Sequence, residues 1–181
     1  MHQFSRKNPR PIPRRKILAR LLPTGVALGV TAARALPQDP WRPVLVAQKG
    51  TITIAGANAL VAAAVAKALE IGVPVAIAVV DESGILKAFN RMDGAGLAGV
   101  DIVQNKAFTA AAFRTPTQAL AQRLQEQPTQ IASFTTTPRV TLLPGGFPIS
   151  VGGMVIGGIG VDDGSGEQDV LVAQAALSAV L

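Results

Sequence analysis

The chain has 181 residues, 49% of them hydrophobic, and a formal net charge of +6, which suits one domain with a packed core. Its positive charge is concentrated at one end: residues 1–35 hold 8 of the 17 basic residues and no acidic one, leaving nine basic against eleven acidic side chains beyond them. A mildly acidic domain with one Trp and no Tyr lacks the phosphate-neutralising charge and stacking surfaces that nucleic-acid binding needs. Nucleic acid is therefore excluded as a partner.

Residues 1–35 are expected to be an export signal. Arg14-Arg15-Lys16-Ile17-Leu18 resembles a twin-arginine motif, and Ala33-Arg34-Ala35 offers a small-x-small cleavage site. The apolar stretch between them is shorter than the ~20 residues of a membrane span, so no stable span is expected after signal removal. This interpretation predicts a periplasmic or secreted protein that folds, and can acquire a cofactor or partner, before export. The alternative is a disordered basic tail on a cytoplasmic protein.

Residues 36–50, which contain several prolines, form a linker or edge segment ahead of the domain at 51–181. A helix is then predicted over 54–71, with Thr53 as its cap, Gly72 at its end and an apolar face of Leu60, Val61, Ala64, Val65, Ala68 and Leu69. A fully buried strand at 73–80 and a second strand at 85–92 are joined by a short turn, which makes them antiparallel.

The second half of the domain continues with a helix over 97–113. A third helix should begin with Thr115 as cap, Pro116 at its first position and Gln118 closing a capping box. Residues 127–143 are polar and Thr-rich, which predicts an irregular segment. Hairpins in place of βαβ crossovers indicate an α+β domain with an antiparallel sheet and helices on its faces.

The last elements are a glycine-rich hairpin and a terminal helix. Two apolar runs within 142–161 meet at Gly152-Gly153, a pair that supplies the positive φ angles of a tight turn. Interior strand glycines such as Gly157, Gly158 and Gly160 mark a bulge or the close approach of a ligand or second chain. Ser165-Gly166-Glu167-Gln168-Asp169 begins a capping-box helix that runs to the chain end.

The glycine-rich loop Gly94-Ala95-Gly96-Leu97-Ala98-Gly99 matches a dinucleotide-binding pattern, but its context does not. The preceding strand belongs to a hairpin, and no acidic residue lies ~20 positions later to hold a ribose. Two interpretations remain open: a plain flexible loop, or helix-start amides that, with Arg91, hold a carboxylate or propionate.

The residue types that the domain lacks restrict its chemistry. The sole histidine is His2, and the chain has no Cys and no Tyr, so a Ser-His-Asp triad, a thiol nucleophile and an ordinary zinc site are excluded. For haem iron this leaves Met92, Met154 or a lysine as ligands, although both methionines are more typical of core filling.

The charged residues suggest no preformed catalytic pair. Asp101 and Lys106 are five positions apart and so do not stack on one helical face. The acidic residues of the last turn are expected to solvate that turn and the helix start after it, and they lack calcium-loop spacing: Asp162, Asp163, Glu167 and Asp169.

Several short motifs, in order and spacing, resemble the GlcG/HbpS family of haem-binding-protein-like domains over residues 51–181. They are Ile71-Gly72-Val73-Pro74-Val75, Val79-Val80-Asp81, Arg91-Met92-Asp93-Gly94, Lys106-Ala107-Phe108-Thr109-Ala110, Pro116-Thr117 and Pro144-Gly145-Gly146. The resemblance implies a profilin-like five-stranded antiparallel sheet between helices, and assembly into dimers or higher oligomers. A histidine-based haem role cannot be transferred to a domain without histidine. The resemblance also implies that the Pro-Gly-Gly loop and the second helix lie near a ligand cleft or a subunit contact.

These observations favour an exported, oligomeric, non-catalytic protein that binds haem or another small planar or anionic ligand, with haem or another tetrapyrrole as the cofactor. Two alternatives stay open: an accessory subunit of a periplasmic oxidoreductase, and a histidine-independent enzyme acting on a small hydroxy or oxo acid. The candidate ligand-binding residues are Arg91, Met92, Asp101, Lys106, Gly145 and Gly146. The stretches 54–66 and 140–161 contain no charged side chain. One small core cannot bury both of them, so apolar surface should remain exposed. This predicts a homo-oligomer whose interface uses the hairpin or the first helix.

Overall fold

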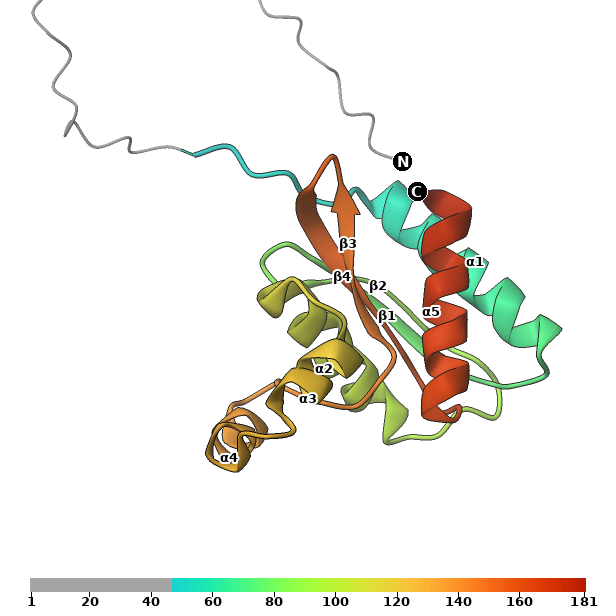
Figure 1. Cartoon of the computed structure of the whole chain (residues 1–181). Coiled ribbons are helices and arrows are strands. Elements are labelled where there is room, and N and C mark those ends of the chain that lie inside the picture. Colours follow the sequence, from blue (N-terminus) through green and yellow to red (C-terminus); the bar gives the residue numbers. More distant parts are fainter. Residues whose placement is uncertain (1–46) are drawn as a thin grey trace, which may run out of the picture. The chain divides into compact units, whose positions relative to one another are not determined.

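A computed structural model describes residues 47–181 (Figure 1). The expected export signal at 1–35, and the linker up to residue 46, lie outside the described residues. The helices are α1 (Ile54–Glu70), α2 (Gly99–Phe113), α3 (Thr117–Leu124), α4 (Pro128–Thr136) and α5 (Gly166–Val180). The strands are β1 (Ala76–Asp81), β2 (Leu86–Arg91), β3 (Gly146–Val151) and β4 (Met154–Asp162).

The strands form an antiparallel sheet in the order β2-β1-β4-β3, which confirms the α+β class. Within residues 47–181 the sheet has four strands, so the expected five-stranded sheet is wrong. The segment ahead of α1 reaches β4 through a backbone hydrogen bond from Ile52 to the Ile156 carbonyl at 2.9 Å. That contact is not continued into the ladder of bonds that defines a strand.

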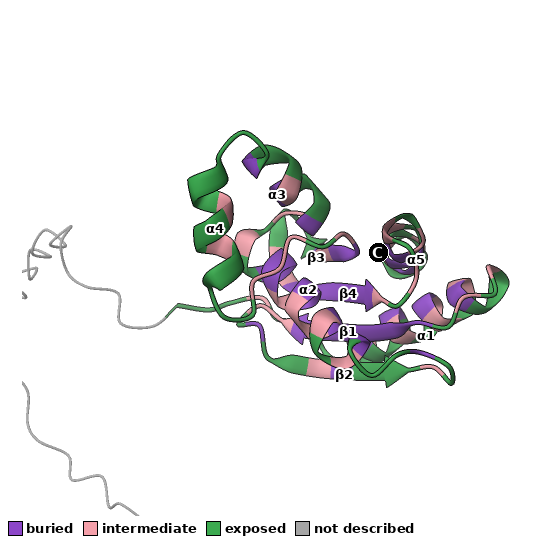
Figure 2. Cartoon of the chain, turned by 90° about the horizontal axis from the view of Figure 1, so that it is seen from below, coloured by how far each residue is buried: buried purple, intermediate pink, exposed green. Residues whose placement is uncertain are grey.

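The two faces of β1 contact different helices, as a period of two along a strand requires. Ile77 and Val79 belong to the core formed with α1 and α5. Ala78 and Val80 pack instead with Val103 and other small residues of α2. The sheet therefore lies between two helical layers (Figure 1), and Figure 2 shows β1 and β4 buried while the edge strand β2 is largely exposed.

The interior glycines of β4 allow α2 to pack directly on the sheet. A Cβ at Gly158 would collide with the Ala107 carbonyl oxygen, and one at Gly160 with the Val103 carbonyl oxygen. The sequence predicted a bulge or a close approach by a ligand or a second chain. A close approach is present at these two positions, but the predicted partner is wrong. The approaching backbone is that of the chain's own helix α2.

Most predicted turns and caps are present. Gly152 and Gly153 have φ of 57° and 79° and join β3 to β4, as a two-residue hairpin turn requires. Thr53 accepts a hydrogen bond from the Gly56 amide at the start of α1. Ser165 and Gln168 form a complete capping box at the start of α5.

Two predictions between residues 115 and 143 are wrong. Helix α3 has Pro116 at its N-cap position and no side-chain cap, so Thr115 does not close a capping box. The segment predicted to be irregular contains α4, with Pro128 in its first turn. The rings of Phe134 on α4 and Phe113 on α2 lie 5.1 Å apart, so an aromatic contact made in the tertiary structure holds a helix that its Thr-rich sequence does not favour.

Candidate functional site

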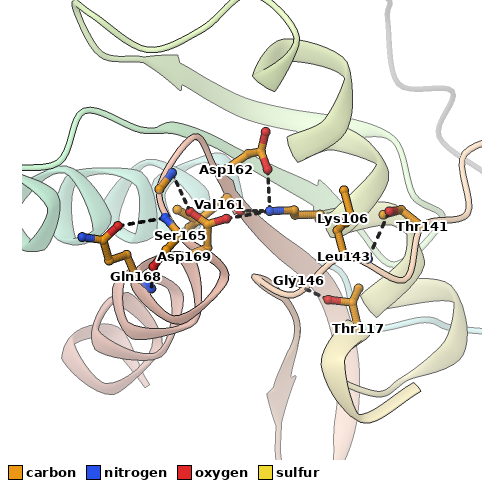
Figure 3. A network of polar contacts seen from close by, with 11 residues as sticks. Lys106, Thr117, Thr141, Leu143, Gly146, Val161, Asp162, Ser165, Gln168 and Asp169 are labelled. Atoms are coloured by element: carbon orange, nitrogen blue, oxygen red, sulfur yellow. Dashed lines mark hydrogen bonds and ion pairs between the residues drawn. The ribbon is translucent and has the colours of Figure 1, made fainter. Parts of the chain in front are cut away.

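A buried lysine, Lys106, lies at the centre of a network of polar contacts with Val161, Asp162 and Asp169 (Figure 3). Lys106 is on α2 and is 1% exposed. Its Nζ donates to the Val161 carbonyl oxygen and to Asp169 Oδ2, both at 2.8 Å, and forms an ion pair with Asp162 Oδ1 at 2.5 Å. These contacts join α2 to the end of β4 and the first turns of α5.

The cluster encloses the ammonium with acceptors and holds more negative than positive charge. Lys106 donates two hydrogen bonds, to the Val161 carbonyl and to Asp169, and forms an ion pair with Asp162 on a third side. The second oxygen of Asp169 accepts from the Gly164 amide at 3.0 Å. Burial raises the pKa of Asp169 above its ordinary value, and the hydrogen bond and charge of Lys106 oppose that rise only in part. Lys106 is therefore held as a structural cation and has no free donor for a substrate.

The Pro-Gly-Gly loop packs directly on this cluster. Gly145 has φ of 107°, and a Cβ there would lie 3.2 Å from Lys106 Nζ and 2.8 Å from Asp169 Cβ. The Gly146 amide donates to the Thr117 hydroxyl at 3.1 Å, and a Cβ at Gly146 would meet the Lys106 backbone. The structure thus brings together three of the candidate residues, with glycine at both loop positions because no side chain fits there.

The acidic residues after β4 differ from their predicted role. Asp169 is 2% exposed and does not solvate the helix start, so that prediction is wrong. A sequence signal for its burial existed: Asp169 shares the i, i+3, i+4, i+7 stripe of α5 with Val172, Ala173 and Ala176, all buried. Lys106 occupies the corresponding stripe of α2. A charged residue within the apolar stripe of each of two helices indicates a buried ion pair.

The loop before α2, which the sequence suggested as an anion site, is in contact with one of the chain's own carboxylates. Asp163 lies against the Gly94–Gly99 loop, and a Cβ at Gly96 would be 2.8 Å from its Oδ1. A carboxylate at this position offsets the positive end of the helix dipole. The sequence interpretation that these amides hold an external carboxylate therefore has a competitor in Asp163.

The remaining candidate residues are dispersed. Asp101 is exposed in the first turn of α2, and Arg91 is exposed at the end of β2. Among residues 47–181, no ion pair joins Asp101 to Lys106 or to Arg91. The acid–base residues considered for a histidine-independent enzyme, Asp101, Lys106 and Arg91, therefore do not form one site.

Met92 follows β2 and borders a surface cavity of about 270 Å³. Its walls are mostly apolar and include Leu69, Val73 and Pro74. Leu69 was predicted on the buried face of its helix, but it is 66% exposed, because the stripe of α1 that faces the sheet is Ala57, Leu60, Ala64 and Ala68. An exposed leucine beside a thioether gives this cavity an apolar, sulfur-bearing surface.

A larger cavity of about 530 Å³ adjoins the Pro-Gly-Gly loop. Pro144 and Gln118 line one part of it, and Ser165, Gly166 and Glu167 line another. Each of the two cavities has one carboxylate, Glu167 here and Asp93 beside Met92. No soft metal ligand borders the larger cavity, so it is less suited to a metal-containing ligand than the Met92 cavity.

Neither a metal cluster nor a membrane span was found in the described chain. Residues 47–181 contain no group of three or more His, Cys, Asp or Glu side chains placed to hold a metal ion. No described helix combines the length and apolar character needed to cross a bilayer.

The fold and the motifs around Lys106 define a class of small α+β domains with a glycine-bearing antiparallel sheet between helices. Residues 52–178 match the family described as "Haem degrading protein HbpS-like". The chain belongs to this HbpS-like family, which confirms the resemblance to GlcG/HbpS proteins.

Three relatives illustrate the family. An uncharacterised 15.0 kDa protein of Citrobacter freundii is 40% identical over 131 residues, covering 72% of this chain and 92% of that protein. The crystal structure of HbpS is 34% identical with a TM-score of 0.70, covering 77% of this chain and 97% of HbpS. A crystal structure described as a PduOC:heme complex is 32% identical with a TM-score of 0.67, covering 72% of this chain and 95% of that one.

Proposed function

We propose that this chain is an exported, oligomeric, non-catalytic protein that binds haem or another tetrapyrrole. The observation that carries the proposal is the likeness to the PduOC domain, whose structure is described as a complex with haem. Family membership supports it, and so does the apolar, thioether-bearing cavity at Met92.

The described residues can supply a ligand to haem iron, but it would be a methionine and not the histidine, cysteine or tyrosine of common haem sites. They contain no His, Cys or Tyr, because the only histidine is His2. The sulfur ligands that remain are the thioethers of Met92 and Met154, and methionine is an established axial ligand of haem iron. Met92 is favoured because it borders a cavity with apolar walls, whereas Met154 is 58% exposed at the hairpin tip.

In this proposal Met92 would hold the iron, and Leu69 and Pro74 would line the face of the ring. Arg91 pairs with Ala76 on the α2 face of the sheet, opposite to Met92, so it takes no part in this site. Bound haem would supply iron redox chemistry. The chain's own contribution is an apolar surface that shields one side of the ring from water.

The test is a haemin titration of the full chain, followed by absorbance in the Soret region, for the wild type and two matched variants. Met92→Leu removes the sulfur and keeps the volume, and it is expected to weaken binding about tenfold or more and to move the Soret maximum. Met154→Leu makes the same change elsewhere and is expected to leave the spectrum unaltered. No Soret shift in the wild type, or no preference for haemin over metal-free porphyrin, would exclude haem as the ligand. An effect of Met154→Leu alone would move the site to the hairpin.

The proposed export and assembly rest on separate observations. The twin-arginine resemblance at residues 14–18 supports export. The hairpin leaves Val151 50% exposed and Met154 58% exposed, and α1 begins with Ile54 at 55%. Exposed apolar side chains at a sheet edge and on an uncharged helix surface support a homo-oligomer of two or more chains.

A further inference from the structure

A third cavity, of about 300 Å³, lies where four segments far apart in the sequence meet. Lys49 comes from the segment before α1, Glu82 from the β1–β2 turn, Arg114 from the end of α2, and Met154 from the β3–β4 hairpin. In the register of the sheet, Asp81 pairs with Gly157 at this end, whereas Ala76 pairs with Asp162 at the end that holds the Lys106 cluster. The cavity is therefore separate from the Met92 and Lys106 regions.

Glu82 provides an ionised carboxylate that the chain's own hydroxyls satisfy only in part. Hydrogen bonding by the Thr51 and Ser83 side chains lowers the pKa of Glu82 below its ordinary value, with a smaller contribution from the charge of Lys49. The Ser83 hydroxyl donates to Oε1 at 2.9 Å. The other oxygen, Oε2, is buried and accepts no hydrogen bond of acceptable geometry from residues 47–181. A buried acceptor on a charged group is costly without a donor. The terminal torsion of a glutamate is soft, so a small rotation would turn Oε2 toward a donor in the cavity.

The same cavity has two cations that lack ion-pair partners. Lys49 and Arg114 both line it, and neither forms an ion pair with a described carboxylate. Arg114 ends α2 with φ of 53° and ψ of 35°, a left-handed conformation that usually belongs to glycine or asparagine at this position. The site thus offers one anionic acceptor and two cationic donors, all charged.

We infer that this cavity binds a small zwitterion of the α-amino acid type, with its ammonium on Glu82 and its carboxylate on Arg114 and Lys49. An ammonium suits Glu82 better than a neutral hydroxyl, because it adds a direct attraction between opposite charges to a hydrogen bond that the ionised carboxylate already strengthens. A guanidinium can donate two parallel hydrogen bonds to one carboxylate. A small molecule with adjacent ammonium and carboxylate groups would give each of these three side chains an oppositely charged partner. The inference does not depend on haem binding.

The first experiment compares three molecules of nearly equal size by calorimetric titration of the full chain: L-alanine, L-lactate and propionate. On the carbon beside the carboxylate, alanine carries an ammonium, lactate a hydroxyl, and propionate only hydrogen. Alanine is expected to bind at least about tenfold more tightly than lactate, and lactate more tightly than propionate. Equal or tighter binding of lactate would overturn the assignment of an ammonium to Glu82. No binding of any of the three at about 10 mM would overturn the site itself.

The second experiment assigns the contacts with variants. Glu82→Gln is expected to weaken alanine binding about tenfold or more while changing propionate binding little. Arg114→Gln is expected to weaken all three ligands, because each has the carboxylate. The control is Glu70→Gln, which neutralises a carboxylate paired with Lys67 on α1, outside this cavity. Thermal unfolding of each variant checks that it is folded. Unchanged alanine binding in folded Glu82→Gln would refute the inference, as would an equal effect of Glu70→Gln.

Discussion

Replacing Lys106 with methionine tests whether the buried cluster holds the domain together. Methionine keeps the approximate length of the side chain but removes the ammonium, which leaves Asp162 and Asp169 without their cation. Asp169 is 2% exposed, so it cannot recover that interaction from water. Removing one partner of a buried ion pair typically costs about 3–5 kcal/mol of unfolding free energy, and we expect a loss in this range for Lys106→Met at neutral pH.

The assay is urea unfolding of the full chain, with Lys67→Met as the matched control. Lys67 pairs with Glu70 at 2.6 Å, but the Glu70 side chain is 67% exposed, and such surface pairs contribute about 0–1 kcal/mol. Adding Asp169→Leu to Lys106→Met should restore part of the loss, because the double variant no longer buries an unpaired carboxylate.

The pH dependence gives a second criterion. Burial already raises the pKa of Asp169, and losing Lys106 removes an opposing interaction, so the variant should recover stability as the pH falls and the carboxylate takes up a proton. A loss below about 1 kcal/mol, or a loss that does not shrink on acidification, would refute the view of Lys106 as a buried structural cation.

Three further outcomes are expected. Gly160→Ala should destabilise the chain by about 1–3 kcal/mol in urea unfolding, because the new Cβ would collide with the Val103 carbonyl oxygen. Gly56→Ala on α1 should be neutral or stabilising, because a Cβ there would lie at ordinary contact distance from its neighbours. Equal effects of the two variants would contradict the close packing of α2 on β4. Because the pKa of Asp169 is raised on folding, its contribution to stability is present at acid pH and is lost as the pH rises through the folded-state pKa. Asp169→Asn should remove the slope that this carboxyl contributes above its ordinary pKa, and an unchanged slope would assign it to another group. Light scattering of the full chain at micromolar concentration should give a mass of two or more chains, and a monomer would refute the proposed oligomer.

The local sequence determined much of the secondary structure. Gly152-Gly153 predicted the hairpin because glycine alone adopts two successive positive φ angles at little cost. Ser165 and Gln168 predicted the start of α5 because a capping box is completed within four residues. The continuous apolar run at residues 73–80 predicted a strand buried on both faces, and the structure has that strand at Ala76–Asp81. These features depend on neighbours within one turn, so the sequence alone specifies them.

The tertiary structure decided which distant groups meet. Lys106 and Asp169 are 63 positions apart, and no local pattern fixes their distance. Each lies in the apolar stripe of its helix, a signal of burial that the prediction for Asp169 missed. The glycines of β4 signalled a close approach, but only the packed structure identifies α2 as the element that approaches. Helix α4 likewise depends on the contact between Phe134 and Phe113, and local propensity did not predict it.

The candidate sites show the same division for a physical reason. Sequence named Met92 as a soft ligand from its chemistry, but its position beside the exposed Leu69 follows from how α1 packs on the sheet. The cavity of Lys49, Glu82 and Arg114 could not be predicted, because its three charges come from separate segments and meet only when the sheet and helices pack. Side-chain chemistry is fixed residue by residue, whereas burial, pKa and the meeting of charges depend on long-range packing.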